Sequence, residues 1–311
     1  MRRLRLVSVT AVMLLGAASC GGDVSERDRG VAAPQDAGTD GGIGAFEPFP
    51  SDVGAADFDP GLFDRSTVID NEWLPLVPGT HSVFRGRAIG DEGPVHRRIE
   101  LTVTDLRKVV AGVPTLVIWI EDFDDDRLVE AELAFRAQDR DGNVWHLGEF
   151  PQEYENGRPA AAPAWIAGVA GARAGITMTG EPRAGAAPYA QGFAPPPVGW
   201  MDYARVQETG VSTCVPVSCY DDVLVTEEFE PDSPGAFQLK YYAPGVGNVR
   251  VGWRGLMEEE RETLVLTKQE TLGPRAMAEV RADALALESR AYRVSKGVYG
   301  TTPPADRMAG V

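Results

Sequence analysis

The chain has 311 residues, with 46 Asp or Glu against 30 Lys or Arg, and its formal net charge at pH 7 is −16. This acidity argues against nucleic acid and anionic lipid headgroups as direct partners, because both are polyanions. Solubility at a crowded cell surface is the preferred explanation for most of the charge. Divalent cations and basic partners remain open.

The first residues have the organisation of an export signal. Three arginines, Arg2, Arg3 and Arg5, precede the apolar run Leu6–Leu15, and small residues follow at positions 16–19. The apolar run is too short to span a bilayer, so residues 1–19 are predicted to be a removable signal peptide.

The segment Leu14–Cys20 (LLGAASC) resembles the lipobox of bacterial lipoprotein precursors, which ends in a cysteine that receives diacylglycerol before cleavage. The resemblance implies that Cys20 is the lipidated first mature residue. It also implies an exported protein anchored to the cell membrane or outer membrane, facing outside the cytoplasm. Ala17 stands where that pattern usually has leucine, and plain secretion after signal peptidase cleavage is the alternative.

The remaining two cysteines form a natural pair. There are three cysteines in all, and an odd number in an exported protein is explained if Cys20 is linked to lipid. Cys214 and Cys219 would then meet an oxidising compartment, which favours a disulfide across a hairpin turn. A redox site is less favoured, because thioredoxin-like chemistry uses C-x-x-C in a βαβ context.

Composition divides the chain into four parts. After the signal peptide, residues 20–61 combine the lipidated cysteine with an acidic linker too poor in apolar residues to fold. Residues 62–296 suffice for a single β-rich domain that ends in a helix. Residues 297–311 are predicted to be a disordered tail.

From residue 80 onward, runs rich in β-branched and aromatic residues alternate with turn residues, which is typical of an antiparallel meander. The run Thr115–Ile120 (TLVIWI) is apolar on both faces, so both faces should be covered. The expected fold is mainly β: an antiparallel meander curled into a barrel or half-barrel, clam-like, with one C-terminal α-helix. The principal expected strands are 82–88, 95–105, 115–120, 128–137, 144–150, 202–213, 220–230, 236–243, 247–254 and 262–270.

Two further segments complete the predicted domain. Residues 157–200, crowded with Gly, Ala and Pro, are interpreted as a flap with one short strand laid over an open end or face of the sheet. A helix is predicted after Gly273 and Pro274, because apolar residues then recur at steps of three and four. It should pack on the sheet, with pairing to a partner helix as the alternative.

The acidic run from Glu121 to Asp126 is a weak candidate for a metal site. Clustered carboxylates can bind Ca²⁺, and Asp124 and Asp126 are the candidate ligands. Their spacing matches no calcium loop, so a solvated hairpin turn is preferred. No metal and no cofactor is expected.

No catalytic motif is present, and the chain has only three histidines. On a regular strand His146 and Glu149 would point to opposite faces and would not converge. Glu149 and Glu153 have the residue type for glycosidase chemistry, but nothing positions them. The sequence therefore favours a non-catalytic protein.

Several runs resemble segments of uncharacterised secreted and lipid-anchored bacterial proteins: DNEWLPLVPGT, DGNVWHLGE, DDVLVTEE and LKYYAPGVGNVR. The resemblance implies an exported, β-rich domain and supplies no catalytic residues.

The preferred function is binding of an apolar small molecule or lipid in an apolar interior. The candidate ligand-binding residues are Trp119, Trp145, Trp165, Tyr189 and Tyr241. The alternative is an envelope interaction or structural module with a filled core, which would contact other envelope proteins. A secreted hydrolase ranks below both.

Overall fold

The computed structural model describes residues 57–90, 93–259 and 261–308. The signal peptide, Cys20 and nearly all of the predicted linker lie outside these residues. Across the described ranges, no helix is both long and apolar enough to cross a membrane.

The first half of the sheet is a meander of five long strands joined by short turns. Ala111 and Gly112 both take positive φ in the turn after the second strand, as do Asp125 and Asp126 after the third. Such left-handed pairs form the tight turns that match the twist of a hairpin. The strands are β1 (Thr80–Gly90), β2 (Gly93–Val110), β3 (Val113–Asp124), β4 (Arg127–Gln138) and β5 (Val144–Glu155).

The predicted flap carries five short strands rather than one: β6 (Arg158–Pro159), β7 (Trp165–Ile166), β8 (Arg173–Met178), β9 (Tyr189–Ala190) and β10 (Gly192–Phe193). β6, β7 and β8 all pair with β5. The flap therefore extends the edge of the first half.

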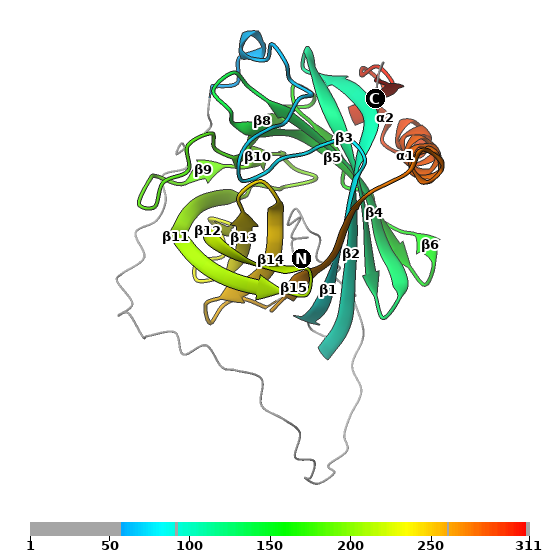
Figure 1. Cartoon of the computed structure of the whole chain (residues 1–311). Helices are drawn as coiled ribbons and strands as arrows, with labels where there is room; N and C mark the ends of the chain where they lie inside the picture. The colour runs from blue at the N-terminus through cyan, green and yellow to red at the C-terminus, as the bar shows by residue number, and fades with distance from the viewer. Residues whose placement is uncertain (1–56, 91–92, 260, 309–311) are drawn as a thin grey trace.

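A second meander follows the flap, and its last strand returns to the beginning of the sheet. Its strands are β11 (Tyr203–Val215), β12 (Ser218–Phe229), β13 (Phe237–Ala243), β14 (Gly247–Arg254) and β15 (Thr263–Thr271). β15 pairs with β1, so the strand order is β10-β8-β5-β4-β3-β2-β1-β15-β14-β13-β12-β11-β9. The two halves curl toward each other without closing (Figure 1). The mainly β, curled prediction is confirmed in its half-barrel form.

The strand Thr115–Ile120 is covered on both faces, as predicted. Val117 and Trp119 share a buried cluster with helix α1 (Pro274–Val294). Leu116 and Ile118 share a different cluster with residues of β11, β12 and β13. Figure 1 shows α1 on the side of β2–β5 turned away from the second half. We call the face of β2–β5 that is turned toward the second half the inner face.

The chain after α1 differs from the predicted disordered tail over residues 297–308. α2 (Lys296–Tyr299) buries Tyr299, and β16 (Asp306–Arg307) pairs with β2. The fully buried Lys108 Nζ lies 2.8 Å from Glu288 Oε1 of α1 and donates to the Pro303 carbonyl at 2.6 Å. A buried ammonium group needs such partners, which order the tail. The end of the predicted linker is also folded, because a short 3₁₀ helix spans Pro60–Leu62.

Candidate functional site

The inner face carries many buried charges, so the expected apolar interior is wrong for this region. Pairing between strands places Asp122 opposite Glu130 and Ala134 opposite Glu149, on the same face as Ile118. The charged or ionisable residues of β2–β5 here, all at most 9% exposed, are Arg97, Asp122, Glu130, Glu132, Arg136, His146 and Glu149. From the facing half, β12 adds Glu228 and β13 adds Lys240. Two apolar clusters fill other parts of the interior.

His146 and Glu149 do converge, contrary to the expectation from a regular strand. The His146 Nε2 and Glu149 Oε2 atoms lie 3.3 Å apart. The register shifts between the pairs Phe135↔Gly148 and Arg136↔His146, and Gly148 has φ +148°. This bulge inserts one residue, so positions three apart reach the same face. A Cβ on Gly148 would also lie 2.6 Å from the Trp165 carbonyl oxygen, which restricts the position to glycine.

Burial and neighbouring charges perturb the ionisation of this group. Burial raises the pKa of Glu132 to about 8, and the nearby Glu149 carboxylate adds to the increase. Burial also lowers the pKa of His146 well below its usual value, with Arg136 acting in the same direction. Both residues therefore favour their neutral forms at neutral pH.

Polar contacts connect this group to the flap, and connect the flap to the second half. The Trp165 indole donates to Glu149 Oε1 at 3.0 Å and stacks on Trp200 with ring centroids 5.0 Å apart. On the facing half, the Glu228 carboxylate lies 2.6 Å from Lys240 Nζ and accepts a hydrogen bond from the Gln191 side-chain amide at 3.0 Å.

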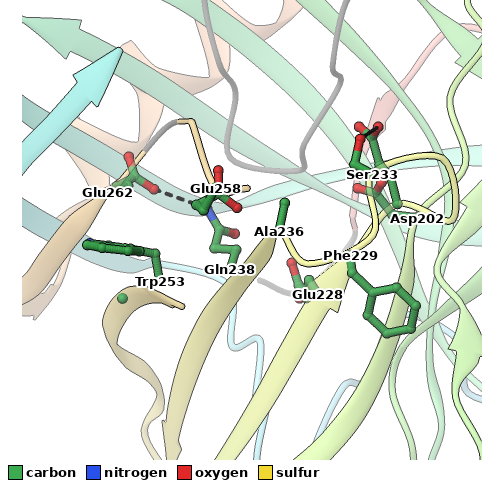
Figure 2. A pocket seen from close by; sticks show the side chains of 11 residues that line it. Asp202, Glu228, Phe229, Ser233, Ala236, Gln238, Trp253, Glu258 and Glu262 are labelled. Carbon is green, nitrogen blue, oxygen red and sulfur yellow. Dashed lines mark hydrogen bonds between the residues drawn. The ribbon is translucent and has the colours of Figure 1, made fainter. Parts of the chain in front are cut away.

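A pocket of about 40 Å³ lies next to the second half and uses Glu228 as part of its wall. Figure 2 shows Trp253 and Glu262 on one side of the view and Asp202 and Phe229 on the other, with Gln238 between them. Five of the eleven lining residues are carboxylates: Asp202, Glu228, Glu230, Glu258 and Glu262. None of the eleven is basic. We call this the acidic pocket.

Asp202 is a buried carboxylate of the acidic pocket with one unpartnered oxygen. It is 2% exposed, and its Oδ2 accepts a hydrogen bond from the Trp200 indole at 3.1 Å, whereas Oδ1 has no hydrogen-bond partner. Burial raises its pKa well above the usual value, and the charges of Glu230 and Glu228 raise it further. The Asp202 carboxyl group therefore resists losing its proton unless a cation lies beside it.

Glu262 lies across the acidic pocket from Asp202, and Gln238 lies between them (Figure 2). The Gln238 amide donates to Glu262 Oε2 at 3.2 Å, leaving Gln238 Oε1 without a partner. Arg97 Nη1 lies 3.3 Å from Glu262 Oε1, yet burial still raises the pKa of Glu262. The acidic pocket therefore contains a second acceptor, Gln238 Oε1, that lacks a donor.

The structure brings four of the five predicted ligand-binding aromatic residues into one packed cluster and places the fifth, Tyr241, in another. Trp119, Trp145 and Trp165 are at most 6% exposed and belong to the cluster that includes α1. Tyr241 packs in a separate cluster, with the Arg250 guanidinium 5.1 Å from its ring centroid. Tyr189 lies in the flap and packs against the same cluster as the three tryptophans, and none of the five lines the acidic pocket. Their role in ligand binding stays a prediction.

The two weak metal candidates have different surroundings. Asp124 lies within β3 and makes two hydrogen bonds of 2.9 Å with the Arg97 guanidinium. Asp126 lies in the following turn, and its side chain is 85% exposed. Within the described residues, no group of three or more His, Cys, Asp or Glu side chains is arranged to hold a metal ion.

The predicted disulfide is present between Cys214 and Cys219, which face each other across the hairpin of β11 and β12. It lies at the turn of this hairpin, whereas Glu228 lies near the opposite end of β12.

The residues of the acidic pocket were not singled out by sequence reasoning. Glu228 and Glu262 belong to predicted strands. Because the chain has 46 acidic residues, being acidic did not distinguish these two from the others. The available signal was the alternation of β12, which places Glu228 on the same face as Leu224 and Thr226. A carboxylate on a face with such neighbours is predicted to be buried.

No protein-family profile and no curated protein sequence matches the chain. Among solved structures, one similar chain from Bacteroides fragilis is described as a candidate exported protein with a YmcC-like fold. Its TM-score is 0.36 and its identity 11%, over 65% of this chain and 100% of that one. A second, a candidate lipoprotein from Parabacteroides distasonis, has a TM-score of 0.34 and 11% identity over 64% of this chain and 99% of that one.

Proposed function

We propose that this protein is exported, is held at a membrane through lipid on Cys20, and acts there as a non-catalytic binding module that takes a positively charged group into the acidic pocket. The lipobox-like segment Leu14–Cys20 supports export and anchoring. The proposal corresponds to the interaction-module alternative rather than to an apolar carrier.

The observation that carries the proposal is the state of Asp202. Its buried Oδ1 lacks a donor, and neighbouring carboxylates oppose its ionisation. An ammonium or guanidinium group would donate to Oδ1 and balance the negative charge at once. A water molecule would donate a hydrogen bond to Oδ1 but would not balance the negative charge.

Two other functions receive less support. An apolar ligand enclosed by the five aromatic residues would need a cavity between them, whereas Trp119, Trp145, Trp165 and Tyr189 pack in one cluster and Tyr241 packs in another. Catalysis by Glu132, His146 and Glu149 would need access for a substrate. All three are at most 3% exposed, and none lines the acidic pocket.

Titration with a simple cation tests the pocket. The ¹⁵N-labelled mature chain (residues 20–311), carrying Cys20→Ser, is titrated with n-butylammonium chloride and, separately, with n-butanol. We expect saturable shifts of the Gln238 side-chain amide and the Trp253 indole with the cation alone. Asp202→Asn should weaken binding roughly tenfold, the scale of one charge-assisted hydrogen bond.

The matched control is Glu279→Gln, since that side chain is 66% exposed on α1 and does not line the pocket. It should bind n-butylammonium like the parent protein. Equal responses to n-butanol and n-butylammonium, or no saturable response, would overturn cation binding.

Anchoring is tested separately by Cys20→Ala in the full chain. The variant should lose membrane association and accumulate as an unprocessed precursor. Unchanged processing and fractionation would refute the lipid anchor while leaving the cation proposal standing.

A further inference from the structure

The edge of the acidic pocket carries exposed apolar side chains in addition to its carboxylates. Leu256 is 91% exposed, Met257 is 62% exposed, and Trp253, which also lines the pocket, is 38% exposed. A Cβ built on Gly235 would lie 3.4 Å from Met257 Cγ, and the Met257 N–H donates to the Gly235 carbonyl. This contact places Met257 beside Ala236, another pocket residue. We call Trp253, Leu256 and Met257 the apolar rim.

The size of the acidic pocket limits what can enter it. A volume of about 40 Å³ holds roughly three water molecules. It therefore admits the head of one ammonium or guanidinium group, and the remainder of any ligand must lie outside, on the apolar rim. A ligand that uses both features needs a cationic head attached to an apolar body.

The apolar rim itself has an affinity for cations. The Arg261 guanidinium lies 5.1 Å from the Trp253 ring centroid, and Arg261 Nε donates to the Glu258 carbonyl at 3.4 Å. An arginine of this chain thus already occupies the face of the aromatic ring beside the pocket. A basic side chain from another molecule that displaces Arg261 would contact the same aromatic face, next to the carboxylates of the pocket.

We infer that the acidic pocket and the apolar rim together form a docking surface for a partner polypeptide that presents a lysine or arginine flanked by apolar residues. This inference rests on the proposed binding of a cation. Charge complementarity supports it: five carboxylates and no basic residue line the pocket, two of the five already pair with a cation (Glu228 with Lys240 and Glu262 with Arg97), and Asp202 Oδ1 has no donor. A polypeptide fits better than a membrane surface, since a chain of net charge −16 is repelled by anionic leaflets.

The test uses three acetylated, amidated tripeptides: Leu-Lys-Leu, Ser-Lys-Ser and Leu-Gln-Leu. Leu-Lys-Leu should bind roughly tenfold more tightly than Ser-Lys-Ser, the gain expected from burying about one apolar side chain. Leu-Gln-Leu should show no saturable binding. The double variant Leu256→Ser/Met257→Ser should lose the tenfold advantage and retain binding of n-butylammonium.

The variant is expected to fold, because both replaced side chains are more than half exposed. Val217→Ser is the matched control, since Val217 is 38% exposed and does not line the pocket. It should leave the preference for Leu-Lys-Leu unchanged.

The outcomes separate the inference from the proposed function. If n-butylammonium binds but Leu-Lys-Leu and Ser-Lys-Ser bind equally, the docking surface is refuted and the cation site stands. If the double variant instead loses binding to vesicles of phosphatidylcholine and phosphatidylethanolamine, a membrane is the occupant and the polypeptide inference is overturned. If the parent protein self-associates in light scattering and the double variant does not, the occupant of the surface is a second copy of this chain, and the inference of a different partner is overturned.

Discussion

His146 and Glu149 lie three residues apart on one strand and still meet, with 3.3 Å between Nε2 and Oε2. Gly148 makes this possible, because its φ of +148° forms the bulge that returns Glu149 to the inner face. The contact between His146 and Glu149 depends on this backbone irregularity.

Gly148→Ala should therefore destabilise the fold strongly. The new Cβ would lie only 2.6 Å from the Trp165 carbonyl oxygen, and alanine would have to adopt an unfavourable φ of +148°. We expect a loss of about 3 kcal/mol in the free energy of unfolding, measured by urea denaturation. Gly157→Ala is the control. Gly157 has φ +72° with no atom near the built Cβ, so it should lose only about 1 kcal/mol. If both variants lose the same free energy of unfolding, the close contact with Trp165 does not contribute to the cost.

The ionisation of Glu132 should make stability depend on pH in a defined direction. Its folded pKa of about 8 lies above the unfolded value of 4.5, so the folded protein holds a proton that the unfolded chain releases. This contribution to stability is fully present below pH 4.5 and is lost as the pH rises through 8.

Glu132→Gln stays neutral, so its stability relative to the parent protein should increase steadily between about pH 5 and pH 8. Urea denaturation at several pH values measures the difference, with Glu279→Gln as an exposed control. Parallel stability curves for parent and Glu132→Gln would contradict the assignment.

Lys108→Met should uncouple the C-terminal segment from the sheet. The change leaves the buried Glu288 carboxylate without its ammonium partner, and such a loss typically costs about 3–5 kcal/mol. Residues 297–308 should also become sensitive to limited proteolysis. In contrast, Lys268→Met breaks an exposed pair with Glu270 and should cost less than about 1 kcal/mol. Similar losses in both variants would refute the anchoring role of Lys108.

Cation binding should strengthen as the pH rises. The pKa of Asp202 is raised in the free protein by burial and by Glu230, whereas a bound cation favours the ionised carboxylate. Binding of n-butylammonium should therefore release protons, and calorimetry in buffers of different ionisation enthalpy will detect the release. Asp202→Asn should have a smaller proton release. An identical release in that variant would assign the proton to another group.

The strand pattern was readable from the sequence because it is local. Turn residues and alternation located all ten long strands, and Thr115–Ile120 is covered on both faces as its composition required. The strand ends were harder to predict. β3 continues through Asp124 because Arg97 lies opposite that residue and forms hydrogen bonds with it. The sequence pattern alone does not show that distant partner.

The site was less predictable, because its contacts join distant parts of the chain. Asp202 and Glu262 are 60 positions apart in the numbering and meet only through the curl of the second half. The bulge at Gly148 likewise reverses the face of Glu149, which strict alternation cannot anticipate. Lys108 orders the tail through Glu288, far away in the sequence.

The position of β1 between β2 and β15 has a consequence for how the molecule assembles. Thr80 pairs with Thr271, so the earliest long strand completes its hydrogen bonding only with the latest. Until that final strand arrives, β1 exposes an unsatisfied edge, which is prone to pair with other chains. Pairing across such a sequence separation is also slow to form. A chain truncated before β15 should therefore aggregate rather than accumulate as a stable half-sheet.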